Sequence, residues 1–282
     1  MQLLIWLLLI ATANAAFGQE PTFASTLPQN IEERKALSRE YLKKANLYRQ
    51  GSYIEQQLLD TALLIDSTNH DAWMAKASWA IKLGDYIGFD YLIGRAIVLS
   101  PESHLGYRAW LKLYTLRDYE GALQDFDHLD NLTPDFMDYP WAENIYYLRG
   151  LAHKQLKQYD LAIANFTECI KRVTAEMGAD FVEPYCYVYR GIVYAQLDSS
   201  QAAMADFDAA IKLYPRCVEA YFHKAQILVA RNQPNLACEN FHQALSYAEQ
   251  GYLRQNIYKE VFDELYGEDI QHRLQEYCVG DE

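Results

Sequence analysis

The chain has 282 residues, and its 25 Lys and Arg side chains are outnumbered by 38 Asp and Glu, which gives a formal net charge of −13. Binding to a phosphate backbone needs an excess of cationic side chains, so this balance argues against a general nucleic-acid binder. Hydrophobic residues make up 51% of the chain, and no apolar run approaches the roughly 20 residues of a membrane span. We therefore expect an acidic protein with a sizeable core, no nucleic-acid partner and no membrane span.

Residues 1–18 are predicted to be a signal peptide, followed by a linker at 19–30. No charged side chain occurs in residues 1–19, and the apolar run at 3–10 is followed by small residues at 11–16. A short apolar segment that ends in small residues is typical of a secretory signal. The mature chain would begin at Ala16 or Gln19. A buried first helix or an uncleaved anchor is the alternative. The pattern predicts an exported protein, periplasmic or extracellular.

An internal repeat organises the chain from residue 70 to residue 251. An alanine followed four residues later by phenylalanine recurs at Ala122/Phe126, Ala162/Phe166, Ala203/Phe207 and Ala237/Phe241. A series of aromatic residues accompanies these pairs, at Trp73, Tyr107, Tyr146, Tyr187 and Tyr221, in steps of 34, 39, 41 and 34 residues. Proline closes three of the units, at Pro101, Pro134 and Pro215.

This pattern resembles the tetratricopeptide repeat family, whose 34-residue unit is a helix–turn–helix. The resemblance implies an all-α fold, a right-handed superhelical α-solenoid of about six repeats with a C-terminal capping helix. The expected parts are an N-terminal helix with a degenerate first repeat (31–69), five units (70–103, 104–137, 143–174, 184–217 and 218–251) and capping helices (252–282). Small residues such as Gly150 and Gly191 would let the two helices of a unit approach closely.

The two ends of the array need covers, because each repeat packs only on its neighbours. Asn30 with Glu33 matches an N-terminal capping box. Apolar side chains recur every four residues from Leu253 to Leu265, which predicts an amphipathic helix that runs to Gly267. A shorter helix is expected from about Asp269 to Tyr277.

No catalytic residue, metal site or cofactor is predicted. The sequence contains no H-E-x-x-H, G-x-S-x-G, Walker or G-x-G-x-x-G motif. His70 and His104 lie 34 residues apart and should stack on adjacent helices, but they lack neighbouring thiolates. The five cysteines form no C-x-x-C pair and suit small apolar positions within helices, although one disulfide would be compatible with export. They are Cys169, Cys186, Cys217, Cys238 and Cys278.

The resemblance places a ligand groove along the first helices of the repeats. Carried over by repeat position, the candidate residues are basic in the middle units and mostly aromatic or apolar later. They are Arg108, Lys112, Tyr147, Leu151, Lys154, Tyr185, Tyr189, Ile192 and Phe222. We expect an exposed aromatic patch beside a basic strip, suited to an extended apolar peptide with an acidic end. Partial burial of these side chains against neighbouring helices or the C-terminal helix is the alternative. Extra residues at 137–141 and 174–183 break the period and should lie on one edge.

The sequence thus predicts a non-enzymatic scaffold that binds a protein or an extended peptide. A small-molecule or glycan-binding envelope protein is the alternative, since the tyrosines and tryptophans would also suit a sugar. An enzyme with a cryptic site, based on cysteine or histidine, is the less favoured alternative.

Overall fold

A computed structural model describes residues 27–254 and 261–278, and all regular secondary structure within these residues is helical. The predicted all-α fold is therefore confirmed. The chain divides into two compact units, Met1–His104 and Leu105–Glu282. Within the described ranges, no helix combines the length and apolarity that crossing a membrane requires. The predicted signal peptide lies outside the described residues.

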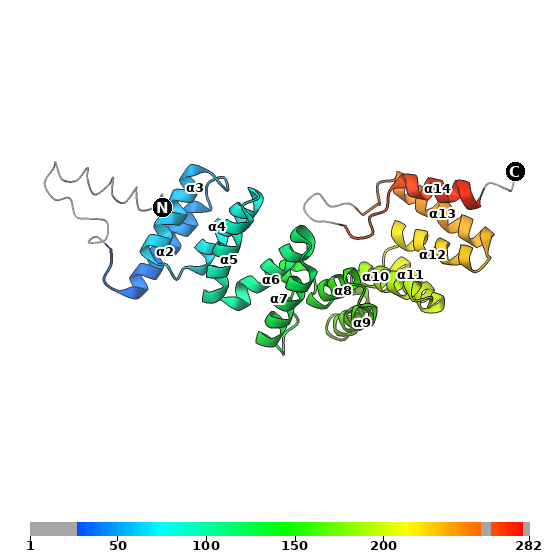
Figure 1. Cartoon of the computed structure of the whole chain (residues 1–282), viewed down its shortest axis with the longest axis horizontal. Helices are drawn as coiled ribbons and strands as arrows, with labels where there is room; N and C mark the ends of the chain where they lie inside the picture. The colour runs from blue at the N-terminus through cyan, green and yellow to red at the C-terminus, as the bar shows by residue number, and fades with distance from the viewer. Residues whose placement is uncertain (1–26, 255–260, 279–282) are drawn as a thin grey trace. The chain divides into compact units, whose positions relative to one another are not determined.

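From residue 27 onward, the first unit contains two helix pairs, followed by the start of a third (Figure 1). The helices are α2 (Ile31–Ala45), α3 (Tyr53–Ile65), α4 (His70–Lys82), α5 (Tyr86–Leu99) and the first residues of α6 (Pro101–Leu111). Asn30 caps α2 as predicted, because its side chain accepts a hydrogen bond from the Glu32 backbone N–H at 2.8 Å.

In its described residues, the second unit continues α6 through a π-helical turn, pairs it with α7 (Tyr119–Leu132), and adds three further helix pairs and a final helix. The elements are η2 (Lys112–Leu116), α7 (Tyr119–Leu132), η3 (Pro140–Ala142), α8 (Ile145–Gln155), α9 (Tyr159–Glu176), η4 (Ala179–Phe181), α10 (Pro184–Gln196), α11 (Ser200–Leu213), α12 (Val218–Ala230), α13 (Pro234–Glu249) and α14 (Gly267–Tyr277). The short helices η3 and η4 fall in the two segments that break the repeat period.

A phenylalanine packed on a glycine joins the two helices of a repeat. Phe166 of α9 and Phe207 of α11 are completely buried. A Cβ atom at Gly150 would come within 2.6 Å of the Phe166 ring, and one at Gly191 within 2.7 Å of the Phe207 ring. Because real Cβ atoms do not approach so closely, the glycine is what allows the ring to sit against the first helix. The predicted packing is confirmed at both repeats.

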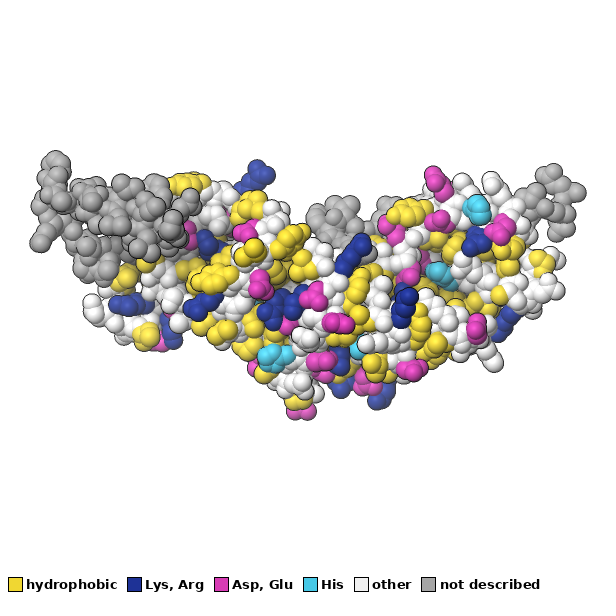
Figure 2. All heavy atoms as spheres, in the orientation of Figure 1, with side chains coloured by type: hydrophobic (Ala, Val, Ile, Leu, Met, Phe, Trp, Pro, Cys, Tyr) yellow, Lys and Arg dark blue, Asp and Glu magenta, His cyan; other side chains and the backbone are white. Residues whose placement is uncertain are grey.

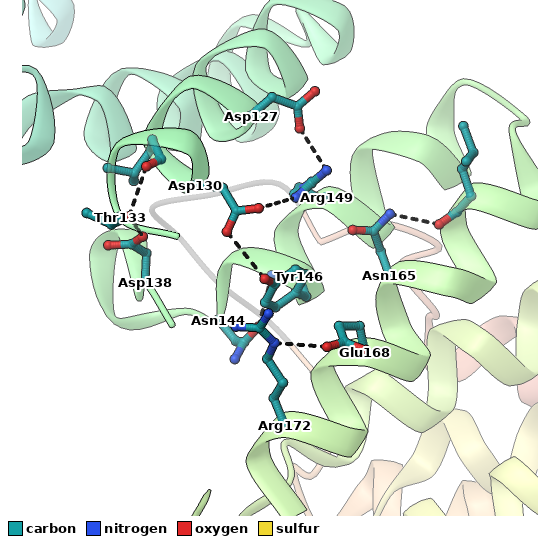
Figure 3. Close-up of polar contacts among 12 residues, drawn as sticks. Asp127, Asp130, Thr133, Asp138, Asn144, Tyr146, Arg149, Asn165, Glu168 and Arg172 are labelled. Atoms are coloured by element: carbon teal, nitrogen blue, oxygen red, sulfur yellow. Dashed lines mark hydrogen bonds and ion pairs between the residues drawn. The ribbon is translucent and has the colours of Figure 1, made fainter. Parts of the chain in front are cut away.

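Polar contacts tie α8 to the preceding helix α7, and α9 to α8 (Figure 3). Arg149 pairs with Asp127 at 2.8 Å and with Asp130 at 3.1 Å. The Tyr146 hydroxyl donates to Asp130 at 3.3 Å, and the Arg172 guanidinium lies 4.8 Å from the centre of the Tyr146 ring. These contacts fix the α8–α9 repeat against the α6–α7 repeat although the linker between them is longer than usual.

The C-terminal region departs from the prediction. Residues 252–254 and 261–266 are not helical, so the predicted helix from Leu253 to Gly267 is wrong in its described part, whereas the shorter helix is present as α14. In a helix the Tyr266 N–H would donate to the Phe262 carbonyl. Instead, the Tyr266 N–H donates to Asp269 at 2.9 Å, and the Phe262 carbonyl accepts from the Tyr189 hydroxyl at 2.9 Å. Tertiary hydrogen bonds have replaced the helical one.

Candidate functional site: a groove filled by the chain's own C-terminal segment

The nine predicted groove residues all lie in the second unit, on α6, η2, α8, α10 and α12. Seven of their side chains are buried, with residue exposures between 1% and 8%: Tyr147, Leu151, Lys154, Tyr185, Tyr189, Ile192 and Phe222. The structure therefore brings these residues together, but the expectation of an exposed aromatic patch is wrong. We name the non-helical residues 252–254 and 261–266 the C-terminal strap, because they lie against this groove.

Arg254 is the first anchor of the C-terminal strap. Its guanidinium carbon lies 3.9 Å from the centre of the Tyr185 ring, a cation–π contact. The guanidinium also donates hydrogen bonds to the Tyr147 hydroxyl at 3.2 and 3.3 Å and to the Tyr189 hydroxyl at 3.2 Å. Its backbone N–H donates to Glu219 of α12 at 3.0 Å. Residues from α8, α10 and α12 therefore meet at one arginine.

Phe262 and Asp263 form the second anchor. The Phe262 ring stacks on Tyr114 of η2, with ring centres 5.5 Å apart and an interplanar angle of 19°. The Tyr189 hydroxyl that accepts from Arg254 also donates to the Phe262 carbonyl. Asp263 pairs with Lys154 of α8 at 2.5 Å. Since one hydroxyl serves both anchors, the two ends of the C-terminal strap meet at the centre of the groove.

The protonation states of Tyr147, Tyr189 and Arg254 are compatible with the hydrogen bonds that these residues form. Burial raises the pKa of Tyr147 and of Tyr189 above the ordinary phenol value, although the Arg254 charge opposes the shift. Both hydroxyls therefore keep their protons near neutral pH. Burial alone would lower the pKa of Arg254, but the Tyr147 and Tyr189 hydroxyls outweigh it and the pKa is raised. The groove thus holds a fully charged guanidinium among neutral phenols.

The predicted basic strip is not free to receive an acidic peptide end. Arg108 forms a two-pronged contact with Asp125 of α7 at 2.8 and 2.6 Å, and Lys112 pairs with the same carboxylate at 2.9 Å. Lys154 is taken by Asp263. Figure 2 likewise shows basic and acidic side chains intermixed on the visible face of this unit. The expectation of an uncompensated cationic strip is wrong, because carboxylates of the same chain neutralise it.

A cavity of about 280 Å³ adjoins Arg254. Residues of both irregular linkers line it, so the two linkers meet at this cavity. They are Tyr139, Ala142, Glu143, Asn144, Met177, Phe181 and Glu183. Trp141 is 60% exposed, and its ring centre lies 4.8 Å from that of Tyr107. The cavity leaves an open approach to the buried arginine.

Two cysteines are joined and three are free. A disulfide links Cys238 of α13 to Cys278, directly after α14, and so ties the end of the described chain to the last repeat. The thiols of Cys169, Cys186 and Cys217 are buried, as expected of small apolar fillers. Burial raises the pKa of Cys217 to about 12, which leaves it without nucleophilic thiolate.

The histidine pair lies in the first unit. His70 Nδ1 and His104 Nε2 are 2.8 Å apart, and Asp71 Oδ1 lies 3.2 Å from the former and 4.0 Å from the latter. Burial and the neighbouring His70 lower the pKa of His104. Because His70 and Asp71 start α4, whose positive end opposes a bound cation, we interpret the cluster as a hydrogen-bonded contact between repeats.

The sequence prediction missed Arg254, Asp263 and Glu219, and it placed Phe262 in the capping helix and not at the groove. A usable signal was nevertheless present, because three groove positions hold tyrosine where phenylalanine would fill the same space. A buried phenol needs a polar partner. Tyr147, Tyr185 and Tyr189 thus signalled that a polar group would enter the groove.

Comparison with known proteins identifies the repeat. A family model described as tetratricopeptide repeat matches residues 143–172, which include α8 and most of α9. The human mitochondrial import receptor subunit TOM70 is 34% identical over 122 residues, and the match covers 43% of this chain and 19% of that relative. The chain therefore spans about a fifth of the length of the curated relative it matches.

Solved structures share the fold at low sequence identity. PilW, described as a widely conserved type IV pilus biogenesis factor, has a TM-score of 0.53 and 16% identity, with 80% of this chain and 96% of PilW covered. PilF of Pseudomonas aeruginosa has a TM-score of 0.52 and 16% identity, with 79% of this chain and 97% of PilF covered.

The structure is a helical-repeat scaffold of the kind that supports protein–protein interaction. Its features are the helix pairs, their glycine–phenylalanine packing and a groove formed by successive repeats. The chain contains a tetratricopeptide repeat, matched at residues 143–172, and shares the fold of tetratricopeptide repeat proteins.

Proposed function

We propose that the protein is a non-enzymatic scaffold that binds a partner protein through the groove of its second unit. The observation that supports this most directly is the C-terminal strap itself, a non-helical segment held across α8, α10 and α12 by side-chain contacts. A groove that holds one such segment has the shape and chemistry to hold another. An import receptor subunit and a pilus biogenesis factor among the similar proteins are consistent with this role.

Site-specific photo-crosslinking tests the binding surface. Phe181 lines the cavity beside Arg254 and is 67% exposed, whereas Leu236 is exposed at the start of α13 and does not line the cavity. With a photoreactive amino acid at each position in turn, a discrete adduct in the native host is expected from position 181 and not from position 236. Equal adducts from both positions, or adducts from position 236 alone, would contradict binding at the groove.

We also propose that the protein works outside the cytoplasm, in the periplasm or at the cell surface. The apolar, charge-free start of the sequence is typical of a signal peptide. The Cys238–Cys278 disulfide supports the same compartment, because disulfides persist mainly in oxidising environments. N-terminal sequencing of the native protein is expected to start at Ala16 or Gln19, and an intact Met1 would refute export.

A further inference from the structure

The contacts of the C-terminal strap resemble those of a bound ligand more than those of a segment that only fills a hydrophobic core. Burying a charge is costly unless it is paired and hydrogen-bonded. Apolar residues of similar size often stabilise a buried contact better than a charged pair does. Here a guanidinium, three phenols and the carboxylate of Glu219 meet in a buried groove. Such polar anchors specify which segment fits, and specificity is what a recognition site requires.

The terminal cap does not depend on the anchors of the C-terminal strap. Ile270 and Leu274 of α14 belong to the same core cluster as Val218 and Phe241, so α14 packs on the last repeat directly. The disulfide between Cys238 and the residue after α14 adds a covalent tie. Tyr252, Leu253 and Leu265 of the strap pack in this cluster, whereas the anchors Arg254, Phe262 and Asp263 do not. The anchors can therefore leave the groove while both flanking helices and the ends of the strap stay in place.

Open space adjoins the C-terminal strap at both anchors. The cavity of about 280 Å³ borders Arg254, and a second cavity of about 360 Å³ is lined by Asp263 and Leu265. An incoming segment can therefore contact the groove before the C-terminal strap has left it.

We propose that the groove is an arginine-recognition site for an extended segment of a partner protein, and that the C-terminal strap occupies it as an internal competitor. The segment presents an arginine to Tyr147, Tyr185 and Tyr189. Beside the arginine it places an aromatic residue on Tyr114 and a carboxylate on Lys154. This inference rests on the proposed function and replaces the apolar, acidic-ended peptide expected from the sequence.

The test uses a fluorescein-labelled synthetic peptide with the sequence of residues 252–266, added to the full mature chain with its disulfide intact. Arg254→Ala weakens the internal competitor and leaves the groove residues unchanged. Arg231→Ala is the matched control, because Arg231 is exposed at the end of α12 and outside the groove. A second peptide with alanine in place of the arginine tests whether the groove reads the guanidinium.

The Arg254→Ala chain is expected to bind the labelled peptide at least tenfold more tightly than the Arg231→Ala chain. An internal segment that occupies the groove ~99% of the time lowers the apparent affinity ~100-fold, so removing it has a large effect. The alanine peptide should bind at least tenfold more weakly, and Tyr185→Ala combined with Arg254→Ala should abolish binding. Equal affinity of the two single variants, or equal binding of the two peptides, would overturn the proposal.

Hydrogen exchange of the wild-type chain gives an answer even if Arg254→Ala does not fold. Saturating peptide should speed amide exchange in the wild type's own residues 261–266 and leave α10 and α11 unchanged. Unchanged amide exchange in residues 261–266 would overturn the proposal that the peptide displaces the C-terminal strap. A dimer that the peptide dissociates would show instead that a second copy supplies the occupant.

Failure of the arginine-recognition proposal can be distinguished from failure of the proposed scaffold function. Crosslinked adducts from position 181 with no peptide binding by the Arg254→Ala chain would keep the scaffold role and reject arginine recognition. Peptide binding by the Arg254→Ala chain without crosslinked adducts from position 181 would support the arginine-recognition site. It would reject the proposal that this surface binds a partner in the cell.

Discussion

The substitution Gly191→Ala tests the glycine–phenylalanine packing that sets the distance between α10 and α11. An added Cβ would lie 2.7 Å from the Phe207 ring, and Phe207 is completely buried. The ring has no room to retreat, so either the ring or the helix must shift.

The net effect is the difference between two terms. Overpacking a filled core costs about 1–3 kcal/mol. Replacing a glycine within a helix by alanine stabilises the helix by about 0.5–1 kcal/mol. We therefore expect Gly191→Ala to destabilise its repeat by about 0.5–2 kcal/mol.

The same substitution at Gly94 is the matched control. Gly94 lies inside α5, and a Cβ there would meet nothing within 4 Å, so only the helix term remains. Gly94→Ala should stabilise its helix pair by about 0.5–1 kcal/mol. Hydrogen exchange resolved by peptide measures each repeat separately, which matters because the chain divides into two units. If Gly191→Ala slows exchange in α10 and α11 as Gly94→Ala does in α4 and α5, the packing argument is wrong.

Three further predictions concern the C-terminus and the histidine pair. Cys238→Ser should destabilise α14 by about 2–4 kcal/mol, because the disulfide closes a loop with a sequence separation of 40; exchange in α14 as slow as in the wild type would contradict this. Truncation after Gly251 should raise surface hydrophobicity, measured by dye binding, because it uncovers the buried groove residues; unchanged dye binding would refute it. For His104, burial and the neighbouring histidine lower the folded-state pKa below 6.5, so the unfolded chain takes up the proton first. The stability from neutral His104 is full above about pH 6.5 and is lost as the pH falls through the folded-state pKa. Urea midpoints of the first unit should therefore fall less on acidification in His104→Gln than in the wild type, and equal falls would exclude His104 as the cause.

The repeat architecture could be predicted because local sequence determines it. Phe166 and Phe207 each pack on a glycine within the same repeat, so a short pattern specifies both partners. The same holds for the linkers, which break a period that the sequence displays. Because each helix pair is stabilised by contacts within the repeat and with its neighbours, distant residues have little influence on its structure.

The C-terminal strap could not be predicted in this way. Leu253, Val261 and Leu265 have helical spacing, and the sequence offers no local reason against a helix. The decisive partners are remote, because Tyr189 takes the Phe262 carbonyl from 73 residues away and Tyr147 holds Arg254 from 107 residues away. Tertiary hydrogen bonds overrode a periodicity that was present. The same partners explain why the predicted groove side chains are buried where exposure was expected.

The position of the C-terminal strap determines how strongly a partner must bind. It lies between α13 and α14, and the Cys238–Cys278 disulfide joins these two helices on its far side. A short tether of this kind keeps an internal segment at an effective concentration of order millimolar. A partner segment with the same contacts therefore binds only where its own local concentration is comparable, or where it adds contacts in the cavity beside Arg254. The C-terminal strap stays attached to α13 through the backbone in either redox state, and the disulfide adds a second covalent tie beyond α14.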